Sequence, residues 1–348
     1  MEIIEPPVGL EAADGEPLYF ATIIAGLESV VADEIAERIP AAELRAATRG
    51  KLFFAASAPP QQALDLMTIE HLLGYLGELT DLPAGREGLA VIEEWAAGLE
   101  LDAALASFHL LHGEPARPSF RITAYRSGSH DYNSQEVSAA AGAGVIRSRG
   151  WGVDLTGYDY DIRVYVIGGT ALAGLRLSPE PLHQRARVRH AAASLNATVA
   201  HAMCRLIAAG PGEIVVDPMC GAGTILVEQA RLQPPHLLIG GDFFTQPLQA
   251  ARENLVAADV DGALLQWDAR RLPLRRGSVD AVICNLPWGR RIGSHLVNRH
   301  LYPGFVRELR RILRPGGKAA LLTQERRLLL RLLEKSRRLT LLEERLLS

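Results

Sequence analysis

Short apolar segments alternate with segments of helical periodicity along the chain, and the pattern differs between its two halves. In the first half, strands are predicted at residues 18–25, 50–56, 119–125, 160–167 and 171–177. Apolar positions with helical spacing occur at residues 27–39 and 82–112, and Pro59–Pro60 can open a further helix. This mixture predicts an α+β fold with a mixed sheet.

Two local signals locate the ends of elements in this half. Gly168 and Gly169 lie between two predicted strands and indicate a hairpin turn. Ser134 is a predicted helix cap, with Glu136 or Val137 as the third helical position. The small residues that follow can pack closely against a sheet.

From about residue 192, strands and helices alternate regularly. Strands are predicted at residues 214–216, 237–242, 263–267, 279–284 and 318–323. Helices are predicted at residues 192–209, from Thr224 onward, and at 246–258, 302–313 and 325–338. This alternation is typical of an α/β fold with a parallel sheet. Residues 339–346 are predicted as a sixth strand, and no segment before Ser348 has the pattern of a seventh.

The composition is that of a globular protein, with 48% hydrophobic and 22% charged residues in a chain of 348. No apolar run reaches the ~18 residues of a membrane span, and residues 1–17 lack the basic start of a signal peptide. Cys204, Cys220 and Cys284 are too few and too scattered for a disulfide framework or a zinc site. We therefore expect a cytoplasmic monomer without a membrane segment or bound metal.

The small net charge of −3 hides an asymmetry between the halves. Residues 1–176 contain 12 Lys and Arg against 25 Asp and Glu, whereas residues 177–348 contain 25 against 15. A nucleic-acid partner would meet the C-terminal half and the segment just before it. Ordinary solvated surfaces remain the alternative explanation.

The most informative segment is IVVDPMCGAGTILVE, from Ile214 to Glu228. It predicts a buried strand, a glycine turn with Gly221 and Gly223, and a helix from Thr224. The run resembles the cofactor loop of S-adenosylmethionine-dependent methyltransferases, especially those that methylate amino groups of RNA or DNA. The resemblance implies cofactor contacts from Asp217, Pro218, Met219, Cys220, Gly221, Gly223 and Thr224. An ordinary turn, or one for another ligand, is the alternative.

Further cofactor contacts are expected where later strands end. Asp242 follows the second strand about 20 residues after the glycines, where related folds place an acid for ribose hydroxyls, and Phe243 can pack against adenine. In the related methyltransferases an acid after the third strand binds the adenine amino group, which implies Asp268 with Ala269. Ser194 and Leu195 are placed near the methionine part by the same resemblance. Each acid alone could instead be a cap or turn residue.

The fourth predicted strand leads directly into Asn285-Leu286-Pro287-Trp288. An exocyclic amine on a base is a poor nucleophile, so an enzyme must accept hydrogen bonds from it. Asn285 Oδ1 and the Leu286 carbonyl can accept them, Pro287 stiffens the turn, and Trp288 can stack on a flipped base. The run resembles the [N/D]-P-P-[Y/F/W] signature of amino-methylating enzymes, with Leu286 in place of the first proline. It implies that these four residues are catalytic and that Asn285 also borders the cofactor; a turn with a packed Trp is the alternative.

A second resemblance covers about residues 65–178. The fragments FRITAYRSGSH, SQEV, GWGVDL and IRVYV are similar to the THUMP domain, a module of tRNA-modifying enzymes that grips the acceptor end of tRNA. Candidate RNA contacts are the arginines in this region, in the basic segment 178–190 and after Trp288. They are Arg121, Arg126, Arg147, Arg149, Arg185, Arg187, Arg290 and Arg291. For each, an ordinary surface arginine is the alternative.

Together the resemblances imply an α+β half followed by an α/β Rossmann-fold class I methyltransferase domain. The expected divisions are a ferredoxin-like domain (1–64), a THUMP domain (65–178), a linker (179–190) and the methyltransferase domain (191–348). The chain looks like the tRNA guanine-N2 methyltransferases that act at position 6 of the acceptor stem, by direct transfer without a covalent enzyme intermediate. The alternatives are position 10 of tRNA, ribosomal RNA, adenine-N6 methylation of DNA, or an inactive RNA-binding protein.

Overall fold

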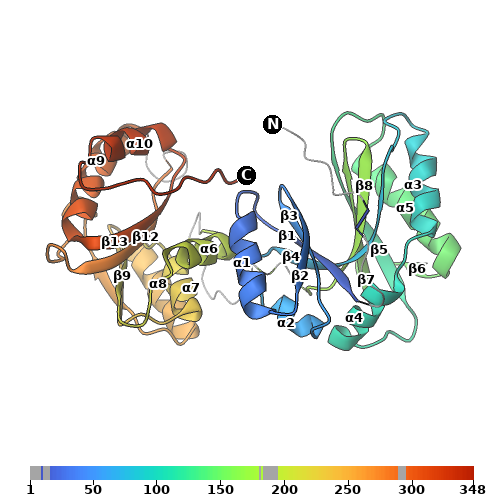
Figure 1. Cartoon of the computed structure of the whole chain (residues 1–348), viewed down its shortest axis with the longest axis horizontal. Helices are drawn as coiled ribbons and strands as arrows, with labels where there is room; N and C mark the ends of the chain where they lie inside the picture. The colour runs from blue at the N-terminus through green and yellow to red at the C-terminus, as the bar shows by residue number, and fades with distance from the viewer. Residues whose placement is uncertain (1–8, 11–15, 180–181, 183–194, 289–294) are drawn as a thin grey trace. The chain divides into compact units, whose positions relative to one another are not determined.

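The computed structural model describes residues 9–10, 16–179, 182, 195–288 and 295–348. They form two compact units, one of residues 1–182 with 346–348 and the other of residues 183–345. Each unit is built around a sheet of its own (Figure 1). In these described segments, no helix combines the length and the apolar character needed to cross a bilayer.

The first unit contains an eight-stranded mixed sheet among its described residues, in the order β2-β3-β1-β4-β8-β7-β5-β6. Its strands are β1 (Leu18–Thr22), β2 (Glu43–Thr48), β3 (Lys51–Ala55), β4 (His71–Leu79), β5 (Ser119–Ser127), β6 (Gly152–Val153), β7 (Tyr160–Ile167) and β8 (Thr170–Arg176). Its helices are α1 (Glu28–Arg38), α2 (Pro60–Leu64), α3 (Gly88–Ala97), α4 (Asp102–His112) and α5 (Ser134–Arg149). The predicted mixed α+β character is confirmed.

The helices cover one face of this sheet because side chains alternate along each strand. Tyr19, Phe54 and Val164 point into the core with residues from α1, α3 and α5, such as Val31 and Ile92. The opposite face carries a smaller apolar cluster with Phe20, Phe53 and Tyr165 at its centre.

Several predicted boundaries in the first unit need correction. The cap of α5 is Asn133 rather than Ser134, because Asn133 Oδ1 accepts from the amides of Gln135 and Glu136 and the Glu136 carboxylate binds back to the Asn133 amide. The segment 82–112 forms two helices, α3 and α4, rather than one helical stretch. The hairpin turn at Gly168-Gly169 is confirmed by the pairing of Ile167 with Thr170.

The second unit is an α/β structure with a five-stranded sheet among its described residues, in the order β11-β10-β9-β12-β13. Every neighbouring pair in it is parallel. The strands are β9 (Ile214–Asp217), β10 (Leu237–Asp242), β11 (Ala263–Gln266), β12 (Val279–Asn285) and β13 (Leu313–Leu322). The helices are α6 (Ala197–Ile207), α7 (Thr224–Leu232), α8 (Thr245–Ala257), α9 (His295–Ile312) and α10 (Arg326–Glu334).

This strand order determines where the predicted site residues meet. The first strand of the unit, β9, lies between β10 and β12, so the chain crosses to the other side of the sheet after β11. Ligands of such sheets bind at the carboxyl ends of the strands beside this reversal. The segments that begin after Asp217, Asp242, Gln266 and Asn285 all leave the sheet at this edge.

Two predictions about the end of the chain are wrong. Residues 339–346 form no strand: Leu341 and Leu342 are 51% and 84% exposed and have no neighbouring strand to pair with in the described structure. In addition, α9 begins at His295 instead of residue 302 and contains Pro303, while β13 begins at Leu313 instead of residue 318.

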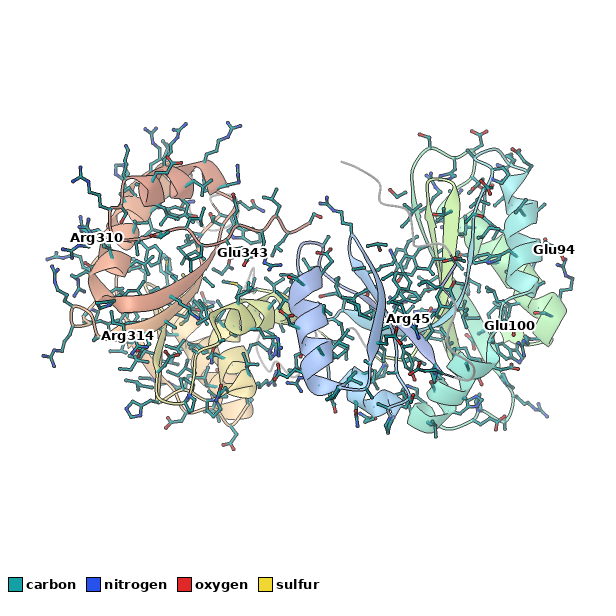
Figure 2. All side chains as sticks on the ribbon, viewed as in Figure 1. Arg45, Glu94, Glu100, Arg310, Arg314 and Glu343 are labelled. Carbon is teal, nitrogen blue, oxygen red and sulfur yellow. The ribbon has the colours of Figure 1, made fainter. Side chains whose placement is uncertain are left out.

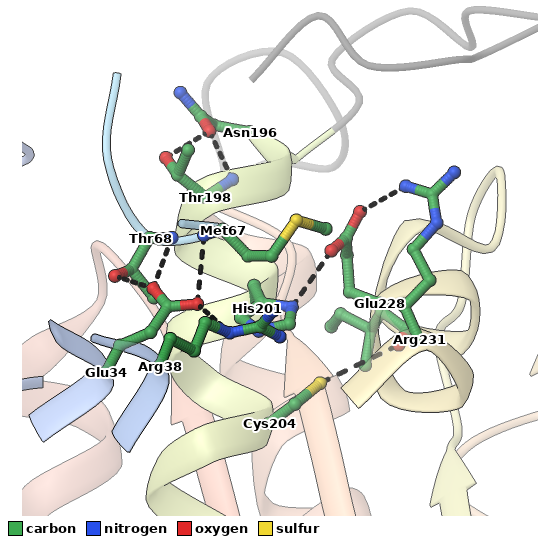
Figure 3. Close-up of polar contacts among 11 residues, drawn as sticks. Glu34, Arg38, Met67, Thr68, Asn196, Thr198, His201, Cys204, Glu228 and Arg231 are labelled. Carbon is green, nitrogen blue, oxygen red and sulfur yellow. Dashed lines mark hydrogen bonds and ion pairs between the residues drawn. The ribbon is translucent and has the colours of Figure 1, made fainter. Parts of the chain in front are cut away.

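A buried carboxylate connects α1 to the chain before β4. Glu34 is fully buried and accepts hydrogen bonds from the backbone amides of Met67 and Thr68, each at 2.9 Å, and from the Thr68 hydroxyl (Figure 3). Arg38, one helical turn later, pairs with the same carboxylate at 3.1 Å. Because Thr68 is fully buried, loss of this carboxylate leaves a buried amide and a buried hydroxyl without their acceptor.

We expect Glu34→Ala to lower the free energy of unfolding by about 3 kcal/mol, measured by urea denaturation. Asp33→Ala is the control, because Asp33 is exposed on the same helix and its loss should change stability by less than about 0.5 kcal/mol. Equal stability of the two variants would contradict the structural role of Glu34.

Candidate active site

The glycine turn between β9 and α7 has the predicted form, and its two glycines serve different purposes. Gly221 and Gly223 both have left-handed backbone angles, with φ of +53° and +78°. A Cβ added to Gly221 would meet no atom within 4 Å, so this position opens onto free space. A Cβ on Gly223 would instead come within 2.9 Å of Leu255 and 3.2 Å of Ala251 on α8. Gly221 therefore leaves room for a ligand, and Gly223 allows α8 to pack.

Asp242, the last residue of β10, is hydrogen-bonded to this turn. Asp242 Oδ2 accepts from the Gly221 amide at 3.1 Å, and Oδ1 accepts from the Phe244 amide at 3.0 Å. Both oxygens keep lone pairs for further donors. Phe243, next in the chain, is 57% exposed, which gives an accessible ring beside a fixed carboxylate.

The acid after β11 has a partner that the sequence did not reveal. Arg270 binds Asp268 through its Nε and Nη2 atoms, with a shortest distance of 2.6 Å, and lowers the pKa of that carboxyl. Gly304 on α9 makes room for Arg270, because a Cβ there would lie 2.8 Å from the arginine Cγ. Trp267 Nε1 donates to the Pro218 carbonyl at 2.9 Å, so the end of β11 is also tied to the glycine turn, and Ala269 is buried.

Asp217 lies at the bottom of the site and is almost completely buried. Its Oδ1 accepts from the Met219 amide at 3.2 Å. The pKa of Asp217 is raised to about 8, mainly by burial and also by the nearby Asp242 carboxylate, while the hydrogen bonds from the Met219 amide and the Cys284 thiol lower it. The same burial raises the pKa of the Cys220 and Cys284 thiols, which makes them poor nucleophiles.

The Asn285–Trp288 turn at the end of β12 is held by hydrogen bonds to two elements, β13 and α9. The Leu286 amide donates to the Leu322 carbonyl of β13 at 2.9 Å. The Pro287 carbonyl accepts from Asn298 Nδ2 at 2.9 Å and from the Tyr302 hydroxyl at 2.8 Å, both on α9. These contacts fix the backbone of the turn beside the carboxyl end of β9.

Asn285 and Trp288 contact each other in this turn. The Trp288 indole Nε1 donates to Asn285 Oδ1 at 3.0 Å, and the Trp288 side chain is 39% exposed. Asn285 Oδ1, the oxygen predicted to accept from a substrate amine, thus already accepts a hydrogen bond from the partly exposed Trp288.

The predicted cofactor residues that the structure describes therefore gather around one edge of the sheet. Open space beside Gly221, an exposed aromatic ring at Phe243 and carboxylates at Asp242 and Asp268 fit a purine nucleoside with ribose hydroxyls. Among the described residues, no three His, Cys, Asp or Glu side chains are grouped so that they could hold a metal ion.

Leu195 lies directly before Asn196, whose side chain caps α6, whereas Ser194 lies outside the described residues. Arg185, Arg187, Arg290 and Arg291 lie outside them as well. Cofactor contact by Ser194 and Leu195 stays a prediction.

The arginines predicted to contact RNA in the first unit all have partners within the protein. Arg121 binds the buried Asp161 through two nitrogens and lies 3.9 Å from the centre of the Tyr158 ring. Arg126 donates to the Gly128 carbonyl. Arg147 pairs with Glu93 and Glu94, and Arg149 pairs with Asp102. Contact with RNA through these side chains stays a prediction.

A buried pair behind the glycine turn belongs to the scaffold. His201 Nδ1 on α6 lies 3.1 Å from Glu228 Oε2 on α7, and Arg231 holds the other Glu228 oxygen at 3.0 Å (Figure 3). The apolar spacing of α6 gave no hint of this pair, which depends on how two helices meet in space.

Two domain families match the chain. Residues 101–175 match the THUMP domain, and residues 184–345 match the family described as RMKL-like, methyltransferase domain. A Thermus thermophilus protein named tRNA (guanine(6)-N2)-methyltransferase is 34% identical over 320 residues, which cover 90% of this chain and 91% of the relative. The crystal structure of TrmN from Thermus thermophilus has a TM-score of 0.75 and 31% identity, covering 95% of this chain and 96% of that one.

A bovine protein named tRNA (guanine(6)-N(2))-methyltransferase THUMP3 is 34% identical over 229 residues. The match covers 62% of this chain and 45% of the bovine protein, so it spans about half the length of that relative.

The buried Asp217 carboxyl leads to a pH-dependent prediction. Its raised pKa means that the folded protein keeps a proton that the unfolded chain loses near pH 4, so its contribution to stability is lost as the pH rises to about 8. Asp217→Asn removes this ionisation. We expect the variant to have a larger free energy of unfolding than the wild type at pH 9. The difference between the two should be smaller at pH 6. Urea denaturation at each pH measures it.

Asp268→Asn is the control for this experiment, because the lowered pKa of Asp268 leaves it ionised throughout this range. Its stability relative to the wild type should not change between pH 6 and pH 9. If the difference in free energy of unfolding between Asp217→Asn and the wild type is the same at both pH values, the burial of a protonated carboxyl is contradicted.

Proposed function

The chain belongs to the family of THUMP-domain tRNA guanine-N2 methyltransferases, and we propose that it methylates N2 of a guanosine in tRNA, at position 6 of the acceptor stem, with S-adenosylmethionine as the donor. The observation that carries this proposal is the fixed Asn285–Trp288 turn beside the open glycine turn. The named position in the Thermus and bovine relatives supports position 6.

The residues around the glycine turn would hold the cofactor. Asp242 suits the ribose hydroxyls, Phe243 the adenine ring, and Asp268 the adenine amino group. Asp217 lies behind the turn; without a ligand its carboxyl is protonated below about pH 8, and a cationic ligand beside it would favour the ionised form. When bound, the cofactor supplies an electrophilic methyl group.

Asn285 Oδ1 and the Leu286 carbonyl would accept the two hydrogens of the guanine amine. The neighbouring Pro287 carbonyl already has two donors, Asn298 and Tyr302, so it is the less suitable acceptor. Two accepted hydrogen bonds orient the nitrogen lone pair toward the methyl carbon, and the amine loses a proton to water after transfer. Catalysis then depends on position rather than on a strong base or a covalent enzyme intermediate.

Trp288 would stack on the flipped guanine and must release Asn285 first. Its indole N–H occupies the oxygen that the amine needs, so the arriving base exchanges one donor for another at Asn285 Oδ1. The Trp288 ring is partly exposed, which leaves it able to rotate toward the base.

The remaining parts of the proposal concern the cellular compartment, the oligomeric state and the metal requirement of the enzyme. The three free cysteines are buried and unpaired with one another, which supports a reducing, cytoplasmic compartment. We also propose a monomer that needs no metal.

Mapping the methylated nucleoside tests the function. Unmodified tRNA transcripts are incubated with isotope-labelled S-adenosylmethionine, digested and analysed by mass spectrometry. We expect label in N2-methylguanosine at position 6, and at least a hundredfold lower rate with Asn285→Ala. A transcript with adenosine at position 6 is the matched substrate control. Label at position 10, in ribosomal RNA or in DNA adenine would overturn the substrate assignment, and no transfer to any of them would overturn the activity.

Two substitutions at Trp288 separate stacking from hydrogen bonding. Trp288→Ala should lower kcat/KM by about 10- to 100-fold, because base stacking is worth about 1–3 kcal/mol. Trp288→Phe keeps a ring but cannot donate to Asn285, so its KM for tRNA should fall about two- to tenfold, the value of one neutral hydrogen bond. Equal losses of kcat/KM in both variants would contradict the exchange at Asn285.

A further inference from the structure

The segment that contains α9, β13 and α10 is strongly cationic. Residues 295–338 include 12 Lys and Arg but only three Asp and Glu, in a protein with a net charge of −3. Ten of the 12 cations are arginines. Arginine binds phosphate through two nitrogens at once, which lysine cannot do.

Some of these cations are used within the fold. Arg311 pairs with Glu308, Arg314 with Asp280, and Arg326 with Glu344. The others are exposed and form no ion pair within the described part of the chain. They include Arg299 and Arg310 on α9, and Arg327, Arg331 and Lys335 on or directly after α10. We call these five residues the cationic face.

The cationic face continues from the active-site edge. Tyr302 of α9 binds both the Pro287 carbonyl and the Thr323 hydroxyl, at 2.8 Å each, and Thr323 lies just before α10. The first half of α9 and the start of α10 therefore lie near the Asn285–Trp288 turn. Arg299 and Arg310 lie ~16 Å apart along α9 and on the same side of it, a spacing that spans several phosphates of one strand.

The opposite side of α10 is used for packing. Leu328, Leu329, Leu332 and Leu333 contact the core of the second unit. The outward side of the helix carries Arg327, Arg331 and Glu334, and its one apolar residue, the half-buried Leu330, offers little surface that could enter a lipid membrane. Figure 2 shows Arg310 projecting away from the sheet, with further nitrogen-tipped side chains along α9 and α10.

We propose that the cationic face binds the phosphate backbone of the RNA duplex next to the target guanosine. The inference rests on the proposed function, because that function brings an RNA to the site at Asn285. It adds a contact surface on the catalytic unit to the contacts predicted for the first unit. Its role is to hold the substrate, so it affects tRNA affinity rather than the transfer step.

Salt-dependent binding to a fluorescent tRNA transcript tests this surface. The test variant, Arg327→Gln/Arg331→Gln, should bind tRNA at least tenfold more weakly at about 100 mM salt. The slope of log K against log salt concentration should fall by about two, one for each lost phosphate contact. The KM for tRNA should rise while kcat and S-adenosylmethionine affinity stay within twofold of the wild type.

The control is Arg252→Gln, an exposed arginine on α8, the helix that connects β10 to β11. It removes one positive charge and should leave the salt slope unchanged. An unchanged slope in the test variant, or the same decrease in both variants, would overturn the proposal. So would wild-type tRNA binding by the test variant together with a loss of binding to vesicles of anionic lipid.

The outcome is independent of the methylation test. A wild type that binds tRNA with a salt slope sensitive to Arg327 and Arg331, but transfers no methyl group, would refute the proposed function and keep the surface. If the wild type methylates tRNA and the test variant binds tRNA with the wild-type salt slope, the proposed function stands and the cationic face is refuted as a binding surface.

Discussion

The hydrogen bonds that hold the Asn285–Trp288 turn against α9 are the constraint on which the active site depends. The Tyr302 ring is fully buried, and its hydroxyl donates to the Pro287 carbonyl. Burial raises the pKa of Tyr302 to about 12, so this hydroxyl remains a donor at any physiological pH. Without this anchor, the strand end would carry the right residues without fixing where their oxygens lie. Methyl transfer to a weak nucleophile depends on that position.

At the same edge of the sheet, side chains at the strand ends hold the loops together and leave acceptor atoms available for a ligand. Asp242 accepts from the Gly221 amide, and Trp267 donates to the Pro218 carbonyl, so the ends of β10 and β11 are both joined to the glycine turn. A ligand in the site would meet a frame that is already assembled. This arrangement reduces the ordering that binding must bring about.

Local patterns were sufficient to predict much of this frame. The apolar strands β9, β10 and β12 and the turn residues after them were correctly located, because a buried strand followed by glycine or an acid is visible in a few neighbouring residues. The half-exposed strand β2 was missed, because Leu44 is the only large apolar residue among its six positions and apolar and polar residues do not alternate regularly along it. The choice of Ser134 over Asn133 as a cap was wrong because either residue can accept from a helix amide, and only the backbone geometry distinguishes them.

The contacts that complete the site could not be predicted, because they join residues far apart in the chain. Tyr302 lies 15 positions after Pro287, and Gly304 lies next to Arg270 only because the segment between β11 and β12 packs against α9. The Trp288–Asn285 contact is local, yet the four-residue motif alone shows neither the rotamer nor the donor. Sequence predicted which groups would be present, and tertiary packing determines which of them already have a partner.

Single-turnover methyl transfer by Tyr302→Phe tests the importance of this anchor most directly. The substitution keeps the buried ring and removes only the hydroxyl that holds the Pro287 carbonyl. We expect the rate of the transfer step to fall about tenfold or more, with cofactor and tRNA affinities within twofold of the wild type. Tyr132→Phe removes a comparable buried donor from the first unit and should transfer at the wild-type rate. A wild-type rate in Tyr302→Phe, or an equal loss in Tyr132→Phe, would contradict the dependence of catalysis on the anchored turn.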